Sequence, residues 1–272
     1  MNAASGLMTG KRGLVMGVAN SHSIAWGIAQ ALHRHGAELA FTYQGDAFRK
    51  RVEPLAASVG SDLVMPCDVE DSASLDAVFE RLAGGWGAID FLVHAIAYSD
   101  KEELKGRYLD TTADNFGRTL RISCYSFTAL ARRAEALMPN GGSLLTLTYL
   151  GAERVMPNYN VMGVAKAALE ASVRYLANDL GPTGIRVNAI SAGPMRTLAG
   201  SAIGDARYVF KYNQTVAPLR RTVTLEEVGG TAVYLLSGLS GGVTGEIHHV
   251  DSGFHAIGMP GAPKNGEPTP DG

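Results

Sequence analysis

The stretch RGLVMGVANSHSIAWGIAQALHRHGAELAFTY, residues 12–43, contains the pattern that decides the fold. Residues 12–18 form a short apolar run typical of a buried strand, and residues 24–36 place apolar side chains at helical spacing. Residues 37–43 form a second apolar run of strand length. A strand, a helix and a strand in this order predict a parallel βαβ unit with a right-handed crossover.

The same alternation continues along the rest of the chain. Further strands are predicted at residues 61–69, 89–97, 142–150, 184–191 and 245–251. Further helices are predicted at residues 46–58, 72–82, 112–137, 158–180 and 224–237. Apolar strands separated by helices are typical of a parallel sheet that is covered on both faces. We therefore predict an α/β fold, a single-domain, Rossmann-like doubly wound parallel sheet of about seven strands.

These elements account for nearly all of the chain and leave no room for a separate substrate domain. One dinucleotide-binding and catalytic domain is therefore expected over residues 1–257. The tail over residues 258–272 is rich in proline and glycine and has almost nothing to bury, so it is expected to be disordered.

Composition excludes several classes of function. A net charge of -2, from 24 basic and 26 acidic residues, gives no electrostatic footprint for nucleic acid. No apolar run approaches the roughly 18–20 residues of a membrane-spanning helix, and the first residues lack the apolar core of a secretory signal. Cys67 and Cys124 lie far apart without a cluster of other ligands, which indicates neither a disulfide framework nor a metal site. A cytoplasmic protein is expected.

The loop GVANSHSIAWG, residues 17–27, is the first candidate for cofactor binding. In this fold the ligand lies beyond the carboxyl ends of the strands, beside the first strand. Gly17 ends that strand, and the helix that begins at Ser23 and Ile24 offers free N–H groups to a pyrophosphate. The usual G-x-G-x-x-G is absent, so the loop alone leaves an ordinary strand-to-helix turn open.

The next two strand ends carry polar residues suited to adenosine. Gln44 occupies the position that usually contacts the ribose, and a neutral side chain there favours NADH. The basic residues 49–51 keep NADPH open. Asp68 and Val69 are predicted to bind adenine, the first by hydrogen bonding and the second as an apolar wall. The simpler interpretations are a surface glutamine and a turn aspartate.

Tyr159 and Lys166 are the candidate working pair of the site. On a helix, seven residues turn about 700° and advance about 10.5 Å, so the two side chains share a face without touching. Lys166 is expected to bind the nicotinamide ribose. Tyr159 is expected to donate to the substrate oxygen that becomes negative as hydride arrives. An unrelated tyrosine and a solvent-reaching lysine are the alternative.

Two later segments complete the predicted crevice. Tyr149 follows the fifth strand and is expected to line the acyl pocket or to support Tyr159. After the sixth strand, the turn at Gly193 and Pro194 is expected to lead into backbone that holds the nicotinamide carboxamide and the pyrophosphate. Residues 199–216 are interpreted as a mobile substrate lid or as an irregular surface loop.

Five motifs give the chain a resemblance to a known family, and they are GVANSHSIAWGIAQALHRHGAELAFTYQ, CDV, LLTLTYLGAERVMPNYNVMGVAK, RVNAISAGPMRTLA and RRTVTLEEVGG. The chain resembles the divergent branch of the short-chain dehydrogenase/reductase superfamily, specifically the bacterial NADH-dependent enoyl-[acyl-carrier-protein] reductases. The resemblance runs from about Lys11 to Phe254. The standard branch has tyrosine and lysine four residues apart with an upstream serine, whereas here the spacing is seven and Tyr149 replaces the serine.

The resemblance implies hydride transfer from NADH, with NADPH less expected, to the β-carbon of a trans-2-enoyl thioester in bacterial type II fatty acid elongation. It implies acyl carrier protein as the partner and a homotetramer as the assembly. Tyr149, Tyr159 and Lys166 would be catalytic, and Ser99 would lie near the substrate with the two tyrosines. The cofactor contacts that it implies are Gly17, Ser23, Ile24, Gln44, Asp68, Val69, Ile96, Lys166, Met195, Arg196, Thr197, Leu198 and Ala199.

Some positions depart from the family pattern or stay open. Ala95 and Ala97 stand where the family often has serine and glycine, and the methyl group of Ala97 could alter how closely nicotinamide or an inhibitor approaches. His22 and His94 are interpreted as structural. Two basic residues of the 199–216 segment could meet an acidic carrier protein or form a solvated helix face, and these are Arg207 and Lys211.

Two competing functions are weighed against enoyl reduction. A carbonyl reductase of the same superfamily is disfavoured by the seven-residue spacing and by Tyr149. A dinucleotide sensor without catalysis is disfavoured because it would need only the cofactor side of the site, whereas this chain has both Tyr159 and Lys166.

Overall fold

The computed structural model describes residues 6–197 and 206–259. Within these ranges, parallel strands form one seven-stranded sheet in the order β3-β2-β1-β4-β5-β6-β7. The strands are β1 Arg12–Met16, β2 Glu38–Tyr43, β3 Val64–Pro66, β4 Phe91–His94, β5 Gly142–Thr148, β6 Ile185–Ala192 and β7 Ile247–Val250. The predicted doubly wound parallel sheet is confirmed.

The winding reverses between β1 and β4. Leu14 of β1 pairs with Ala40 of β2 on one side and with Leu92 of β4 on the other. The crossovers leave these strands in opposite directions across the sheet, so a crevice opens beyond their carboxyl ends. This switch point is the place at which the sequence predicts the cofactor.

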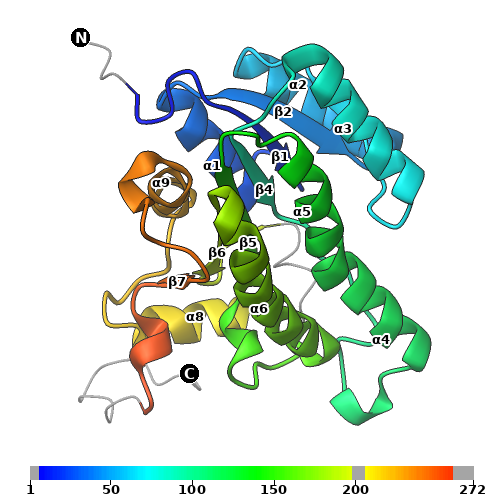
Figure 1. Ribbon diagram of the computed structural model, residues 1–272. Helices are drawn as coiled ribbons and strands as arrows, with labels where there is room; N and C mark the ends of the chain where they lie inside the picture. The colour runs from blue at the N-terminus through cyan, green and yellow to red at the C-terminus, as the bar shows by residue number, and fades with distance from the viewer. Residues whose placement is uncertain (1–5, 198–205, 260–272) are drawn as a thin grey trace.

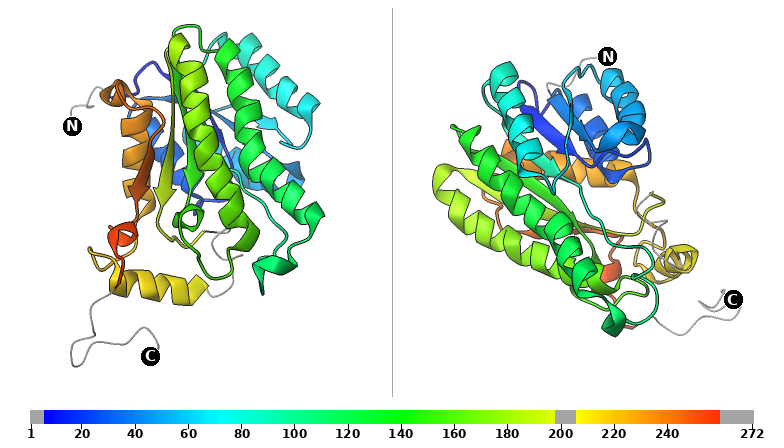
Figure 2. Two further views of the ribbon diagram at one scale, coloured as in Figure 1. Left: turned by 60° about the horizontal axis from the view of Figure 1, so that its bottom comes forward. Right: turned by 90° about the vertical axis from the view of Figure 1, so that its right-hand side faces the viewer.

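Helices cover both faces of the sheet (Figures 1 and 2). The principal helices are α1 Ile24–Arg34, α2 Gly45–Ser58, α3 Ser72–Trp86, α4 Ala113–Leu120, α5 Ser126–Ala136, α6 Asn160–Leu180, α8 Ala206–Val216 and α9 Leu225–Leu236. One apolar core joins α1, α2 and α9 to the sheet through residues such as Trp26 and Val228. The other joins α3, α5 and α6 through Phe79, Phe127 and Leu169.

Glycines allow α1 and α9 to pack closely. A Cβ added at Gly27 would lie 2.8 Å from the Cβ of Leu225, and one added at Gly229 would lie 2.8 Å from the Cβ of Ala31. Gly27 belongs to the loop that the sequence assigns to the pyrophosphate. Its requirement for glycine arises from helix packing, because a side chain there would push α9 away.

The largest differences from the predicted elements lie in two segments. The predicted helix over 112–137 is divided by a π-helical turn at Arg121–Tyr125, where the hydroxyl of Ser126 donates to the carbonyl of Ile122 at 2.6 Å. Part of the segment interpreted as a lid or irregular loop forms α8. Leu198, Ala199 and residues 260–272 of the tail lie outside the described residues.

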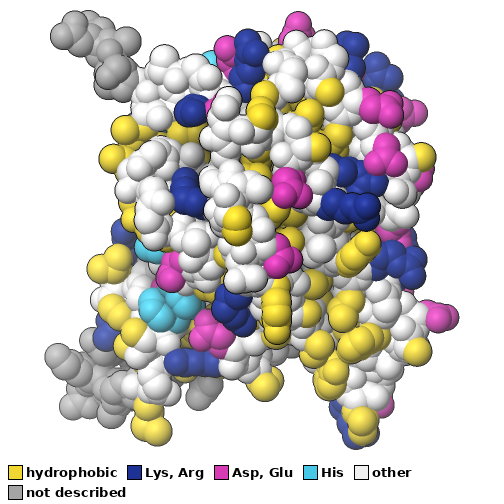
Figure 3. All heavy atoms as spheres, viewed as in Figure 1, with side chains coloured by type: hydrophobic (Ala, Val, Ile, Leu, Met, Phe, Trp, Pro, Cys, Tyr) yellow, Lys and Arg dark blue, Asp and Glu magenta, His cyan; other side chains and the backbone are white. Residues whose placement is uncertain are grey.

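The surface is mixed in charge. Basic and acidic side chains are interspersed over the face drawn in Figure 3, without an extended area of one sign. No helix in residues 6–197 and 206–259 is long and apolar enough to cross a membrane.

Candidate active site

The loop after β1 is shaped by one glycine and one serine. Gly17 has a φ of +95°, and a Cβ there would lie 2.0 Å from the carbonyl oxygen of Ala95, so no other residue fits beside the end of β4. The hydroxyl of Ser23 accepts from the backbone N–H groups of Ala19 and Asn20, each at 3.0 Å. Ser23 is the N-cap residue of α1, so this loop leads directly into a helix N-terminus that can receive an anion.

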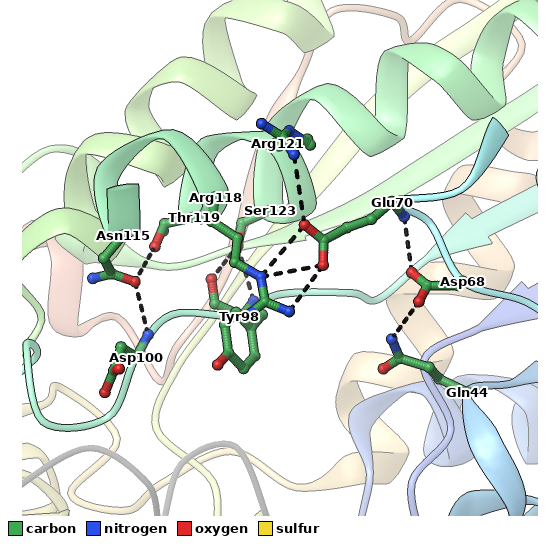
Figure 4. A network of polar contacts seen from close by, with 10 residues as sticks. All are labelled: Gln44, Asp68, Glu70, Tyr98, Asp100, Asn115, Arg118, Thr119, Arg121 and Ser123. Carbon is green, nitrogen blue, oxygen red and sulfur yellow. Dashed lines mark hydrogen bonds and ion pairs between the residues drawn. The ribbon is translucent and has the colours of Figure 1, made fainter. Parts of the chain in front are cut away.

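Gln44 and Asp68, the residues predicted to contact adenosine, are in direct contact (Figure 4). The side-chain amide of Gln44 donates to Asp68 Oδ2 at 3.2 Å, and Asp68 Oδ1 accepts from the backbone N–H of Glu70 at 2.9 Å. Val69 is half-buried and packs against the core of the second face. The structure therefore brings these predicted residues together across the ends of β2 and β3.

The basic segment 49–51 contributes one residue that is already paired. Arg49 Nε donates to Glu53 Oε1 at 2.7 Å within α2. This ion pair favours the interpretation of Arg49 as a helix-surface residue rather than as a ligand for a 2′-phosphate.

A chain of polar contacts continues from Asp68 to the loop after β4. Arg118 donates to Glu70 Oε2 at 2.9 Å, and its guanidinium lies 4.7 Å from the ring centre of Tyr98. Figure 4 shows Glu70 between Asp68 and the two arginines that approach it, Arg118 and Arg121. The contacts thus connect α4 and the π-helical turn to Asp68 and Gln44.

Hydrogen bonds from α4 hold the loop after β4 in place. Thr119 and Asn115 both donate to the hydroxyl of Ser99, at 2.9 and 3.2 Å. Asn115 Oδ1 also accepts from the backbone N–H of Asp100 at 2.9 Å. The hydroxyl of Ser99 is therefore engaged with α4, and its predicted place near the substrate stays a prediction. Asn115, which is buried, is a loop-shaping residue that the sequence analysis missed.

Ala95, Ile96 and Ala97 follow β4 in the same loop. Ile96 is half-buried and packs against the core of the second face, whereas Ala97 is exposed. The effect of the Ala97 methyl group on the approach of a ligand stays a prediction.

The two predicted tyrosines lie in direct contact. Tyr149 follows the last residue of β5, and its ring meets that of Tyr159 edge to face, with centroids 5.1 Å apart and planes at 72°. Burial raises the pKa of Tyr149 to about 12, and burial raises the pKa of Tyr159 further above its usual range. Both phenols therefore stay protonated near neutral pH and can donate a hydrogen bond.

Tyr159 precedes α6 and is not part of it. It is the N-cap residue, with φ −106°, and the asparagines on either side have positive φ, +54° at Asn158 and +39° at Asn160. The prediction that Tyr159 and Lys166 lie seven residues apart on one helix is therefore wrong for Tyr159, because this residue precedes the regular helix. Asparagine tolerates this conformation better than most residues, and the sequence NYN is the signal that could have indicated it.

Two glycines that the sequence analysis missed make room for the Tyr159 ring. A Cβ at Gly151 would lie 2.3 Å from Tyr159 Cδ1, and a Cβ at Gly163 would lie 2.7 Å from the carbonyl oxygen of Gly151. The segment after β5 therefore packs directly on the start of α6, and the ring has no freedom to tilt toward Gly151.

Lys166 lies two turns into α6 and is 6 % exposed. Its Nζ donates to the carbonyl oxygen of Leu147 in β5 at 2.7 Å. Burial lowers the pKa of Lys166 to about 8, so the ammonium form still dominates at neutral pH. An ammonium has three protons to donate, and those not given to Leu147 can bind ribose hydroxyls.

His94 has the structural position that the sequence predicts for it. Its ring nitrogens lie 2.8 Å from Thr146 Oγ1 and 2.9 Å from Ser126 Oγ in the core. Burial lowers the pKa of His94 to about 3, so the ring is neutral and cannot serve as a base near pH 7. His22 is exposed and lies 3.3 Å from the hydroxyl of Ser21.

The loop after β6 borders a hollow beside α8. A pocket of about 360 Å³ is lined by His22, Met195, Arg196, Phe210, Gln214, Thr222, Val223 and Leu225. Arg196 lies over the ring of Phe210 at 5.8 Å, and the N–H of Thr197 donates to the carbonyl of Met195 at 2.9 Å. The predicted contacts Met195 and Arg196 thus face the same hollow as the loop after β1.

The described residues contain no set of side chains that could bind a metal ion. No group of three or more histidine, cysteine, aspartate or glutamate side chains there is placed to hold a metal ion. Cys67 and Cys124 are both free thiols.

Comparison with known proteins identifies the family of the chain. The sequence profile described as "Enoyl-(Acyl carrier protein) reductase" matches residues 17–255. The chain belongs to this family. It is 68 % identical over 259 residues to enoyl-[acyl-carrier-protein] reductase [NADH] 1 of Rhizobium meliloti, and the match covers 95 % of each chain. The corresponding enzyme of Salmonella typhimurium is 54 % identical, with 93 % of this chain and 97 % of that protein covered.

Solved structures agree with this assignment. The enoyl-acyl-carrier-protein reductase of Anaplasma phagocytophilum, in complex with NAD, matches with a TM-score of 0.92 and 59 % identity over 95 % of this chain and 99 % of that chain. The Bacillus cereus enzyme, in complex with NADP+ and an indole naphthyridinone, matches with a TM-score of 0.92 and 54 % identity over 93 % of this chain and 100 % of that chain. The family expected from the sequence motifs is confirmed.

Proposed function

We propose that the protein reduces the trans-2 double bond of enoyl thioesters with NADH, as a bacterial enoyl-[acyl-carrier-protein] reductase. The observation that carries this proposal is the contact between the rings of Tyr149 and Tyr159, whose centroids lie 5.1 Å apart, together with the buried Lys166 on the helix that Tyr159 caps. A phenol that stays protonated in an apolar site is suited to an oxygen that becomes negative during the reaction. The family match and the names of the relatives support the same activity.

The residues at the crevice fit a dinucleotide. Gln44 offers a neutral amide to the adenosine ribose, and the neighbouring carboxylate of Asp68 disfavours a 2′-phosphate there, so NADH is the proposed cofactor. The NAD in the Anaplasma relative supports this choice, although the Bacillus relative holds NADP+. The proposed cofactor contacts are Gly17, Ser23, Ile24, Gln44, Asp68, Val69, Ile96, Lys166 and Met195 to Ala199. Lys166, with protons beyond the one given to Leu147, would hold the nicotinamide ribose.

NADH, when bound, supplies the hydride that the β-carbon of the enoyl thioester accepts. Tyr159 then donates its phenolic proton in a hydrogen bond to the thioester oxygen, which carries the electron pair displaced from the double bond. A proton from water, taken up at the α-carbon of this enolate, restores the carbonyl and leaves a saturated thioester. Tyr149 supports the Tyr159 ring edge to face, and Ser99 is the third proposed substrate residue.

An apolar cluster surrounds Tyr159 and is suited to the acyl chain. Its members are Leu104, Phe116, Leu120, Tyr149, Met156, Val161, Met162 and Ala165. These side chains exclude water from the phenol, which strengthens its hydrogen bond to a charged oxygen because the local dielectric is low.

The substrate carrier is proposed to be acyl carrier protein. Arg207 and Lys211 are exposed on α8, beside the pocket that Met195 borders, and an acidic partner could bind there. A cytoplasmic location would fit a soluble carrier.

A homotetramer is proposed as the assembly. Tyr125, 63 % exposed, and Tyr175, 76 % exposed, lie on the π-helical turn and on α6. Figure 3 shows apolar side chains gathered toward one end of this face of the molecule. Exposed aromatic side chains on adjacent helices are typical of surfaces that become buried in an interface.

The test follows the loss of absorbance of the reduced cofactor with crotonyl thioesters of acyl carrier protein and of coenzyme A. We expect turnover with NADH, and a decrease in kcat of about 10²-fold or more in Tyr159→Phe with little change in NADH binding. Tyr234→Phe, which changes an exposed tyrosine on α9 in the same way, should keep wild-type kcat. Binding of NADH without turnover of any enoyl thioester would contradict the proposal.

A further inference from the structure

Glu170 is a buried carboxylate that the proposed reaction does not use. It lies one helical turn beyond Lys166 on α6 and is 7 % exposed. Its Oε1 accepts a hydrogen bond of 2.6 Å from the hydroxyl of Thr148, the last residue of β5 and the neighbour of Tyr149. A carboxylate loses much of its hydration when it is buried, so its retention at this position requires a compensating interaction.

The groups facing Glu170 come from several elements. Burial raises its pKa, the hydroxyl of Thr148 lowers it, Glu153 raises it, and His249 and Arg174 lower it. His249 Nε2 lies within hydrogen-bonding distance of Glu153 Oε1, at 3.0 Å. Glu153 lies four residues after Tyr149 and His249 lies in β7, so charged groups from two elements other than α6 act on the carboxylate.

The charge of Glu170 acts on both polar residues of the proposed site. Burial lowers the pKa of Lys166, while Cys124 and Glu170 raise it. Burial raises the pKa of Tyr159, and Tyr149 and Glu170 raise it further. A negative charge at Glu170 therefore favours an ammonium at Lys166 and a protonated phenol at Tyr159, the two forms that the proposed reaction needs.

We propose that Glu170 is a positioning residue whose carboxylate, buried one helical turn from Lys166 on α6, keeps Lys166 in its ammonium form for binding the cofactor ribose. The inference rests on the role proposed above for Lys166. Its physical basis is the spacing of four residues, which places the two side chains on one face of α6. Lys166 donates to the carbonyl of Leu147, and Glu170 accepts from Thr148, the next residue of β5, so both charged groups reach the end of the same strand. An opposite charge nearby offsets part of the desolvation of a buried ammonium.

A purely structural role is the alternative, in which the Thr148–Glu170 bond only ties α6 to β5. Two substitutions separate the effect of the Glu170 charge from the effect of the Thr148–Glu170 hydrogen bond. Glu170→Gln removes the charge and keeps an oxygen that can accept from Thr148. Thr148→Val removes the hydroxyl and keeps the carboxylate. A third variant, Glu170→Asp, keeps the charge but shortens the side chain.

The experiment measures the Kd of NADH by fluorescence between about pH 6.5 and about pH 9.5, a range that includes the lowered pKa of Lys166. The ammonium form dominates below that pKa and is lost as pH rises through it, so wild-type affinity should fall at alkaline pH. In Glu170→Gln the fall should begin at a pH lower by about 1. Thr148→Val, Glu170→Asp and the surface control Glu135→Gln should keep the wild-type midpoint.

The outcomes distinguish this inference from the proposed function. An unchanged alkaline midpoint in folded Glu170→Gln would overturn the role of the charge while leaving the role of Lys166 intact. If Glu170→Gln does not fold, a midpoint that moves in Thr148→Val or Glu170→Asp would overturn it, because both keep the carboxylate. If wild type shows no alkaline loss of NADH affinity, the proposed role of Lys166 itself fails.

Discussion

At the scale of single residues, the site depends on neighbouring side chains and glycines that fix the position of the Tyr159 ring. Gly151 leaves space for its ring, Tyr149 meets it edge to face, and the asparagines beside it accept the backbone turn. Tyr149, Tyr159 and Lys166 could be predicted from the sequence because their types and spacing match a family motif. Gly151 and Gly163 could not, since their importance arises from a contact between segments that only the folded chain brings together.

Gly151→Ala tests this packing. The added Cβ would lie 2.3 Å from Tyr159 Cδ1, so the ring must move. We expect kcat to fall by about 10²-fold, because a displacement of about 1 Å in a catalytic group can have that effect. Gly84→Ala is the matched control, since nothing lies within 4 Å of a Cβ there. Wild-type kcat in Gly151→Ala would show that the ring position is not critical.

His94 gives a prediction for stability at acidic pH. Its pKa in the folded protein is lowered to about 3 by burial. As pH falls below about 6.5, His94 becomes protonated in the unfolded chain but stays neutral in the folded protein. The unfolded state then binds more protons, so the free energy of unfolding decreases as pH falls. In His94→Gln, the free energy of unfolding in urea should decline less between about pH 7 and about pH 5, by roughly 1–2 kcal/mol. An equal decline in both proteins would contradict the neutral assignment.

At the scale of elements, the sheet and most helices could be predicted from the alternation of apolar runs. The start of α6 is predicted too early, because the positive φ angles at Asn158 and Asn160 interrupt a segment that otherwise has helical spacing. The π-helical turn at Arg121–Tyr125 could not be predicted, because its residues do not differ in pattern from those of an ordinary helix. That turn carries Ser123, whose hydroxyl accepts from the N–H of Tyr98 at 2.9 Å. Both unpredicted features support the site.

The packing of α1 on α9 gives the prediction at this scale. Gly229→Ala would place a Cβ 2.8 Å from that of Ala31 and 2.9 Å from the carbonyl oxygen of Gly27. We expect a loss of about 1–3 kcal/mol in the free energy of unfolding as the helices separate. Gly230→Ala, the next residue on the same helix, has open space around its Cβ and should be neutral or stabilising by up to about 1 kcal/mol. Equal effects of the two substitutions in denaturant titrations would contradict the account of this contact.

At the scale of the whole molecule, the sheet brings together residues far apart in sequence. Gln44 and Asp68 follow β2 and β3. The loop after β4 lies between these residues and Tyr149, which follows β5, Tyr159, the N-cap residue of α6, and Lys166 on α6. The order of strands places these groups along one edge, as the rule for parallel sheets requires. The arrangement supports a hydride donor held along the edge and an acceptor held at the tyrosines.

The most direct test of this account uses NADH deuterated at both C4 positions, crotonyl-[acyl-carrier-protein] as acceptor, and mass spectrometry of the product. The account predicts a saturated butyryl thioester with one deuterium at the β-carbon, formed by wild type and strongly reduced in Tyr159→Phe. Deuterium at the carbonyl carbon, or a product without deuterium, would contradict enoyl reduction by hydride transfer to the β-carbon.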